Sequence, residues 1–305
     1  MRRFVFVVAV VAAWMLVPIV ASAQTPSREK TTAEEFEAKL GYQSGDVTLK
    51  NGMATIHVPQ SFRFLGPEGS RRLLVDAWGN PPGSADDVLG MLVPSAVSPL
   101  SDDGWGVVIT FNDDGYVNDN DAGKINYANL LKEMQEDAAA ANEERKEQGF
   151  DTVTLVGWAE APHYDAAAHK LYWAKDLMFG SDGEHTLNYN IRILGRRGVL
   201  VLNAVSSIKQ LAAIRAQTGA ILPAVEFNEG HRYSDYLPGT DKAAAYGIGG
   251  LILGGVAAKA GFFKLLWVGL LAAKKFVVAA LVAMFAFLKR LFRKPSDAAE
   301  ASASS

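Results

Sequence analysis

The stretch HKLYWAKDLMFGSDGEHTLNYNIRILGRRGVLVLNAV, residues 169–205, decides the fold. It holds three apolar-rich runs that end at Phe179, Leu194 and Val205 and are joined by the short links GSDG and GRRG. Runs of this composition between glycine-containing links are typical of β-strands. Links this short allow only a reversal of the chain, so neighbouring strands should pair antiparallel. The stretch therefore predicts a meander within an antiparallel sheet.

Further strands and helices are expected around the meander. One strand should end at Trp158, a buried strand should cover residues 105–111, and the alternation around Asn51-Gly52 predicts a hairpin with a two-residue turn. Residues 59–104 contain six prolines, which predicts a loop-rich region with one strand at residues 73–78.

Helical spacing of apolar residues is strongest over residues 124–149, which predicts the one long helix of the domain. Shorter helices are expected at residues 32–41, where Thr32 and Glu35 form a capping box, and at residues 207–217. Runs of strands with few, segregated helices predict an α+β domain: an antiparallel sheet with one long and one or two short helices.

Both ends of the chain carry membrane signals. Residues 1–23 have a basic start, an apolar run and the small-residue triplet Ala21-Ser22-Ala23, the pattern of a cleaved signal peptide. The alternative is an uncleaved anchor. The apolar run Tyr246–Leu288 would be about 65 Å long as a helix, enough to span a hydrocarbon core of about 30 Å. It predicts a C-terminal transmembrane helix.

The basic cluster that follows this run, at residues 289–294, should stay in the cytoplasm by the positive-inside rule. We therefore expect a single-pass protein of the bacterial inner membrane, with its body in the periplasm and its C-terminus in the cytoplasm. The expected organisation is a signal peptide (1–23), an exported domain (24–245) with a linker from about residue 226, an anchor with its basic flank (246–294) and a disordered tail (295–305).

The anchor contains two features that suit helix contacts. Four lysines fall on one helical face, either at the membrane interface or against a partner helix: Lys259, Lys264, Lys274 and Lys275. Gly250 and Gly254 have the GxxxG spacing of closely packed membrane helices, which predicts self-association.

Composition excludes several classes of function. Of the 33 acidic residues only Asp297 and Glu300 lie outside residues 24–245, whereas ten of the 30 basic residues do. The net charge of residues 24–245 is therefore near −11. A domain with this negative charge is not expected to bind nucleic acid. The absence of cysteine excludes disulfides and a lipidated cysteine. No cofactor motif is present, and none of the five histidines belongs to an HExxH sequence, so no cofactor or metal is expected.

The acidic loop FNDDGYVNDNDAGK, residues 111–124, packs four aspartates and three asparagines around two glycines. It does not fit a calcium-binding EF-hand loop, because placing Gly115 at the sixth position puts Thr110 in the first ligand position. We expect a turn instead, with Asp121 capping a helix that begins near Gly123. A calcium site of another type is the alternative.

The strongest candidate for binding is a polar row on the strand HTLNYNIRIL. A period of two places Leu187 to Ile193 on one face at odd positions, and Asn188, Asn190 and Arg192 on the other. Two amides and a guanidinium in a row could hold a carboxylate or a glycan. More often such a row is the solvated face of an antiparallel sheet. We expect this here, so that Arg192→Ala would change stability by less than about 0.5 kcal/mol. A buried Arg192 would instead pair with an acid such as Asp176 on the preceding strand.

Several stretches together resemble an uncharacterised bacterial membrane-anchored family, domain of unknown function 2167: WGNPP, FNDDGYVNDNDA, GWAEAPHYD, KLYWAKDL, LNYNIRILGRRGVLVLN and DKAAAYG. The resemblance covers about Gly45 to the anchor and implies a signal peptide, an exported body and a C-terminal membrane segment. It implies no activity and no catalytic residues. We therefore expect a periplasmic binding or interaction module without enzymatic activity. The alternative is an envelope hydrolase whose residues, such as Asp113, His163 and Glu160, meet only in the fold.

Overall fold

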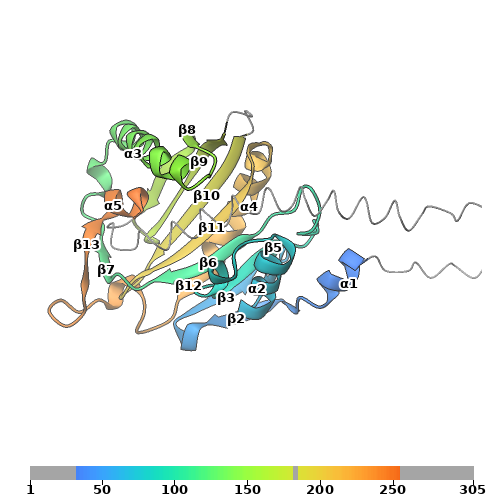
Figure 1. The fold of residues 1–305 in the computed structure, drawn as a ribbon. Coiled ribbons are helices and arrows are strands. Elements are labelled where there is room, and N and C mark those ends of the chain that lie inside the picture. Colours follow the sequence, from blue (N-terminus) through green and yellow to red (C-terminus); the bar gives the residue numbers. More distant parts are fainter. Residues whose placement is uncertain (1–31, 181–184, 255–305) are drawn as a thin grey trace, which may run out of the picture.

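The computed structural model describes residues 32–180 and 185–254 (Figure 1). Its centre is an eight-stranded sheet of order β1-β4-β5-β6-β11-β10-β9-β8, in which every pairing is antiparallel. The predicted meander is confirmed by four consecutive strands, β8 (Val153–Asp165), β9 (Lys170–Phe179), β10 (His185–Leu194) and β11 (Val199–Ser207). The remaining strands are β6 (Val107–Asn112), β5 (Gly90–Pro94), β4 (Phe62–Leu65) and β1 (Tyr42–Gln43).

Two smaller sheets accompany the large one. One has the order β12-β3-β2, with β2 (Gly45–Leu49), β3 (Ala54–Val58) and β12 (Val225–Phe227). The other pairs β7 (Tyr116–Asn118) in parallel with β13 (Ala243–Gly247). The helices are α1 (Thr32–Ala38), α2 (Pro67–Arg71), α3 (Tyr127–Glu147), α4 (Leu211–Ala224) and α5 (Ile248–Leu253). This confirms the α+β class of the domain.

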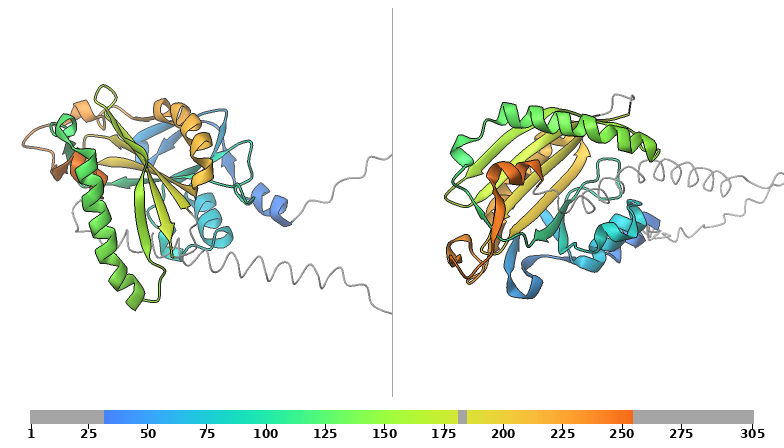
Figure 2. Two further views of the ribbon diagram at one scale, coloured as in Figure 1. Left: turned by 90° about the horizontal axis from the view of Figure 1, so that it is seen from above. Right: turned by 60° about the vertical axis from the view of Figure 1, so that its left-hand side comes forward.

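Both faces of the large sheet are covered. α4 and the sheet β12-β3-β2 pack on one face, where Tyr189 and Ile191 of β10 join Ile214 of α4 in a common core. α3 and α5 lie on the other face, around Trp173 of β9. Seen from above, α3 and α4 stand on opposite sides of the strands (Figure 2). The predicted alternation along β10 is therefore confirmed.

Several local predictions differ from the structure. The hairpin at Asn51-Gly52 is present, but its turn is a 3₁₀ turn over Lys50–Gly52, with φ positive at each residue. The strand expected at residues 73–78 is wrong, because this segment continues α2 as a π-helical turn, Arg72–Ala77. The loop-rich region around it contains β4 and β5 as well. The helix expected at 207–217 continues to residue 224.

The segment expected as a linker, from Glu226, forms ordered elements that end with β13 and α5. α5 buries Ile248, Leu251 and Ile252 against the face that carries Trp173. Within the described ranges, no helix is long and apolar enough to cross a membrane. The predicted signal peptide, the tail and the anchor beyond residue 254 lie outside the described residues.

The acidic loop holds this C-terminal segment in place. Asp121 does not cap the helical turn that follows it; its carboxylate instead accepts hydrogen bonds from the backbone amides of Ile248 and Gly249 at the start of α5, at 2.9 and 3.0 Å. The hydroxyl of Tyr246 donates to Asp114 at 2.7 Å. α3 is capped by Asn126. The expected cap was therefore wrong, and the aspartate caps a helix 127 residues later in the chain.

Gly250 and Gly254, the pair expected to mediate self-association, do not lie on one uninterrupted helix. Gly254 ends α5 with a left-handed φ of 113°. A Cβ at Gly250 would lie 2.6 Å from the Cβ of Tyr246, so the chain's own packing requires this glycine. Self-association through the two residues stays a prediction.

Candidate functional site

The three residues predicted from periodicity, Asn188, Asn190 and Arg192, share the face of β10 that α3 and α5 partly cover. Cross-strand register places Lys175 beside Asn188 and Trp173 beside Asn190 on β9. On β11 it places Asn203 beside Asn190. We call these six residues the donor row: Trp173, Lys175, Asn188, Asn190, Arg192 and Asn203.

The row is not a solvated face. Arg192 is only 5% exposed and Asn190 3%. The expectation of a plain surface arginine was therefore wrong, because α5 and its neighbours cover this face. Pairing of Arg192 with Asp176 does not occur either. Asp176 lies opposite Leu187, on the α4 face, and its Oδ1 is 2.7 Å from Nδ1 of His185.

The guanidinium of Arg192 is held by neutral oxygens. Nη1 donates to the carbonyl of Ile191 at 2.9 Å and to Oδ1 of Asn203 at 3.0 Å, and Nη2 donates to Oδ1 of Asn190 at 3.3 Å. The guanidinium also lies 5.0 Å from the ring centroid of Trp173, a cation–π distance. Because a guanidinium has no acceptor atoms, the amide oxygens must be the atoms that face it.

The row contains one buried donor without an acceptor. The Oδ1 of Asn188 accepts a hydrogen bond from Asn190 at 2.8 Å, so every side-chain amide oxygen of the row is occupied from within it. Three of the five N–H hydrogens of Arg192 donate in the bonds described above. Nε1 of Trp173, a residue 1% exposed, meets no acceptor among the described residues.

Charge on this face is positive. Burial, together with the nearby charge of Arg192, lowers the pKa of Lys175 to about 8. Burial also lowers the pKa of Arg192, while the proximity of Tyr246 opposes the shift; the guanidinium stays protonated at neutral pH. Tyr246, hydrogen-bonded to Asp114, thus links the acidic loop to the edge of the donor row.

The catalytic set considered for a hydrolase is not assembled. Glu160 and His163 lie on β8, where Glu160 accepts a hydrogen bond from Nε of Arg215 at 3.0 Å and His163 packs on the ring of Tyr172. Asp113 follows β6, which is four strand positions from β8 in the sheet. At about 4.8 Å per position, that is roughly 19 Å along the sheet.

A second polar cluster lies at the turn between β8 and β9. The hydroxyl of Tyr164 donates to Asp119 at 2.7 Å and lies 3.3 Å from Nδ1 of His169, whose ring stacks on Tyr233 at 4.0 Å. This cluster joins the acidic loop to the hairpin. Within residues 32–180 and 185–254, no three His, Asp or Glu side chains are grouped so that they could hold a metal ion.

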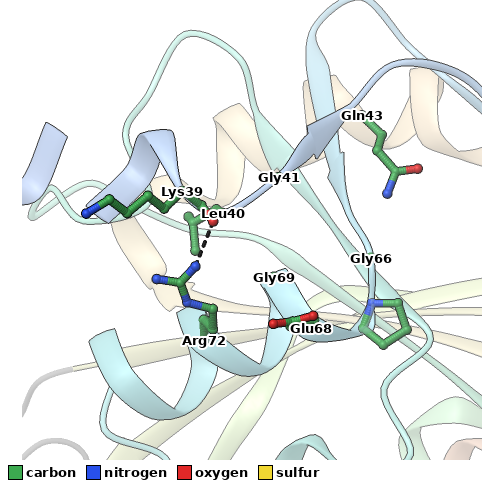
Figure 3. A pocket seen from close by; sticks show the side chains of 9 residues that line it. Lys39, Leu40, Gly41, Gln43, Gly66, Glu68, Gly69 and Arg72 are labelled. Atoms are coloured by element: carbon green, nitrogen blue, oxygen red, sulfur yellow. Dashed lines mark hydrogen bonds between the residues drawn. The ribbon is translucent and has the colours of Figure 1, made fainter. Parts of the chain in front are cut away.

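Figure 3 shows a pocket of about 360 Å³ between the end of α1 and the start of α2. Gly41, Gly66 and Gly69 form part of its wall, and Arg72 crosses it to donate to the carbonyl of Lys39 at 2.7 Å. Its lining contains neither a hydroxyl nor an imidazole group. It lies by β1 and β4, at the opposite end of the sheet order from the donor row.

Sequence reasoning identified half of the donor row. It missed Lys175, Trp173 and Asn203, which lie on neighbouring strands. The same period of two places Trp173 and Lys175 on one face of β9, and that signal was available. The register that brings them beside Asn190 and Asn188 depends on the lengths of the links, which periodicity does not give.

Comparison with known proteins gives one family. The model described as "Protein of unknown function (DUF2167)" matches residues 41–285. No curated protein matches the chain.

Solved structures that resemble parts of the chain are distant. They include cyanobacterial PsbP (CyanoP) from Synechocystis, with a TM-score of 0.35 and 6% identity over 62% of this chain and 94% of that one. Mog1p, a Ran-binding protein of Saccharomyces cerevisiae, has a TM-score of 0.30 and 11% identity; the match covers 65% of this chain and 100% of Mog1p. LpqN of Mycobacterium tuberculosis, involved in cell envelope biogenesis, has a TM-score of 0.29 and 16% identity; the match covers 66% of this chain and 99% of LpqN. Similarities this weak identify no shared function.

Proposed function

The chain belongs to the family described as protein of unknown function (DUF2167), and we propose that it is a membrane-anchored bacterial envelope protein whose exported body binds a ligand without chemical turnover. The observation that carries the binding role is the donor row. Its side-chain amide oxygens are all occupied from within, and the buried indole N–H of Trp173 meets no acceptor among the described residues. Such a surface suits the recognition of a ligand.

Export and anchoring are supported by the sequence at the two ends. The leader pattern at residues 1–23 would direct the body into the periplasm, and the apolar run with its basic flank would hold it at the inner membrane. A binding module with one membrane tether fits a body that carries strong negative charge, since anionic lipid headgroups would repel it without the anchor.

Two measurements test the proposal. Protease added to spheroplasts should digest the body and spare a tag placed after Ser305; cleavage of that tag from outside would refute the single-crossing topology. In a deletion strain with an envelope defect, Glu160→Gln and His163→Ala should restore growth as the wild-type protein does, whereas Asn188→Ala should not. Failure of Glu160→Gln and His163→Ala to complement, with normal complementation by Asn188→Ala, would favour the hydrolase.

A further inference from the structure

We infer that α3 protects the free edge of the large sheet: it keeps β8 from pairing with the same strand of a second copy of the chain. This role is independent of the proposed binding function, because it involves the edge of the sheet and not the donor row. The two edge strands of the sheet differ in length. β1 has only two residues, whereas β8 has thirteen, more than twice the typical length of a strand. β8 is therefore the edge at which a further strand could be added.

The first part of β8 has the composition of a strand that associates readily. Residues 153–156 read VTLV, a run without charge or proline in which three residues are β-branched. Thr154 and Val156 are exposed, Val156 by 42%. Segments of this composition at an open edge pair with other strands. Every copy of the chain carries the same segment, and two identical strands can pair antiparallel about a two-fold axis. A second copy is thus the partner that suits this edge.

Asn142 of α3 takes the place that a residue of a ninth strand would occupy. Its Nδ2 donates to the carbonyl of Val153 at 2.9 Å, and its Oδ1 accepts from the backbone N–H of Val153 at 2.7 Å. Two residues that face each other in a hydrogen-bonded antiparallel pair exchange the same two bonds. One side chain therefore satisfies both backbone groups that Val153 presents at the edge.

Gln135, two turns earlier in α3, covers the next part of the edge. Its Nε2 donates to the carbonyls of Leu155 and Val156 at 3.1 and 3.2 Å, at a point where the register between β8 and β9 shifts. Seven residues of helix span about 10.5 Å, and three residues of strand span about 10 Å. The two amides therefore match the spacing of residues 153 and 156 on the strand, and α3 lies beside β8 at one end of the sheet (Figure 1).

α3 contributes little to the core for its length. Of its 21 residues only Leu130 is buried. Leu131, Met134 and Ala138 are partly buried against the cluster that includes Val153. The hydrogen bonds to the edge of β8 are therefore a large part of the attachment of α3. Covering that edge accounts for a long, mostly polar helix at this position.

The later part of β8 is protected by other means. The carbonyl of Ala159 accepts a hydrogen bond from Nη2 of Arg215 at 3.5 Å. Pro162 has no N–H that could donate to a further strand. The register between β8 and β9 also shifts twice between Trp158 and His163, and such irregularities disfavour regular pairing. The part of the edge that depends on α3 is thus residues 153–156.

Cross-linking of the full chain in detergent tests this role. The chain contains no cysteine, so Thr154→Cys places a single thiol beside the edge, and a short bismaleimide joins two copies efficiently when their edges meet. In this background Gln135→Ala/Asn142→Ala should raise the yield of cross-linked dimer about tenfold or more, the factor expected when two side chains with neutral hydrogen bonds are lost. Hydrogen exchange is the second readout. In the double variant the amide of Val153 should be unprotected in dilute protein and become protected as the protein concentration rises.

Three controls separate edge pairing from other association. Asp102→Cys carries an exposed thiol in the turn before β6 and measures cross-linking through the anchor or by chance; its yield should not respond to the substitutions in α3. Asn129→Ala removes an exposed amide of the same helix and should leave the dimer yield at the wild-type level. Val156→Lys, added to the double variant, should return the yield to the wild-type level without restoring Tm, because a lysine on an edge strand opposes pairing.

A folded double variant with an unchanged dimer yield would overturn the protective role of α3. An equal rise with the thiol at position 102 would overturn it as well, since it would show general aggregation. A loss of Tm with exchange at Val153 that does not depend on concentration would show that Gln135 and Asn142 only stabilise the fold. If the double variant does not fold, Gln135→Ala alone decides: it should raise the yield about threefold or more, and an unchanged yield would reject the role.

Discussion

Replacing Asp121 by alanine should release α5 from the acidic loop. The carboxylate accepts two hydrogen bonds from the first amides of α5, at 2.9 and 3.0 Å, and offsets the positive end of that helix. Loss of an N-terminal cap costs about 0.5–2 kcal/mol, and loss of the charge at a partly buried helix end adds up to about 2 kcal/mol. We expect a total near 2 kcal/mol, since α5 is only six residues long.

For a chain of this size, about 2 kcal/mol corresponds to a fall of roughly 4–8 °C in Tm. Thermal unfolding of the full chain, followed by circular dichroism, gives this value. Hydrogen exchange gives its location: residues 243–253 should lose protection before the strands of the large sheet do. Asp121→Asn keeps a side-chain acceptor and should show about half of the effect. Asn120→Ala, an exposed neighbour in the same loop, is the matched control and should leave both readouts unchanged.

Either of two outcomes would refute this role of Asp121. A Tm change below about 1 °C would show that the two hydrogen bonds do not hold α5. A large fall in Tm with uniform loss of protection across the sheet would show that Asp121 supports the whole body and not the junction of β13 and α5.

Four other results are expected. Arg192→Ala should destabilise the protein by about 1–3 kcal/mol, measured by urea unfolding, because it leaves the buried oxygen of Asn190 without its donor. A change below about 0.5 kcal/mol, as for a substitution at a plain surface position, would contradict this prediction. The hydrogen bond from Arg196 lowers the pKa of Asp241 from 3.8 to about 2. The ionised Asp241 therefore stabilises the folded protein fully above about pH 4, and this stabilisation is lost as the pH falls toward 2. Asp241→Asn should remove this part of the acid dependence; a profile of urea midpoint against pH between about 2 and 5 that matches the wild-type profile would contradict it. Asn142→Ala should cost about 1–3 kcal/mol in urea unfolding, since this side chain pairs with both the backbone N–H and C=O at the start of the edge strand β8. Millimolar calcium should leave Tm at its value in chelator, because carboxylates of the acidic loop already accept hydrogen bonds from protein donors; a rise of several degrees would restore the calcium interpretation.

The parts of the fold that sequence could predict are those in which local pattern and tertiary structure agree. The meander from β8 to β11 alternates apolar and polar residues and has short links, so its period and its connections both indicate antiparallel strands. α3 has helical spacing and a capping residue, Asn126. Residues 73–78 show the opposite case. A run of apolar residues this short fits either a strand or a buried helical turn, and Pro67 at the start of α2 begins a helix that continues through it.

The candidate site was predicted in part, and its burial was not, for a single physical reason. Periodicity states which residues share a face of β10, but not whether another element covers that face. The cover includes α5, whose apolar residues Ile248, Leu251 and Ile252 look from their hydropathy like the beginning of a membrane anchor. If this segment is assigned to the bilayer, the face of β10 that carries Arg192 loses its cover, and Arg192 is then expected to be exposed to solvent. Apolar residues next to an anchor can serve a core or a membrane equally well. Only the pairing of β13 with β7 and the cap from Asp121 distinguish the two, and both involve residues more than a hundred positions away.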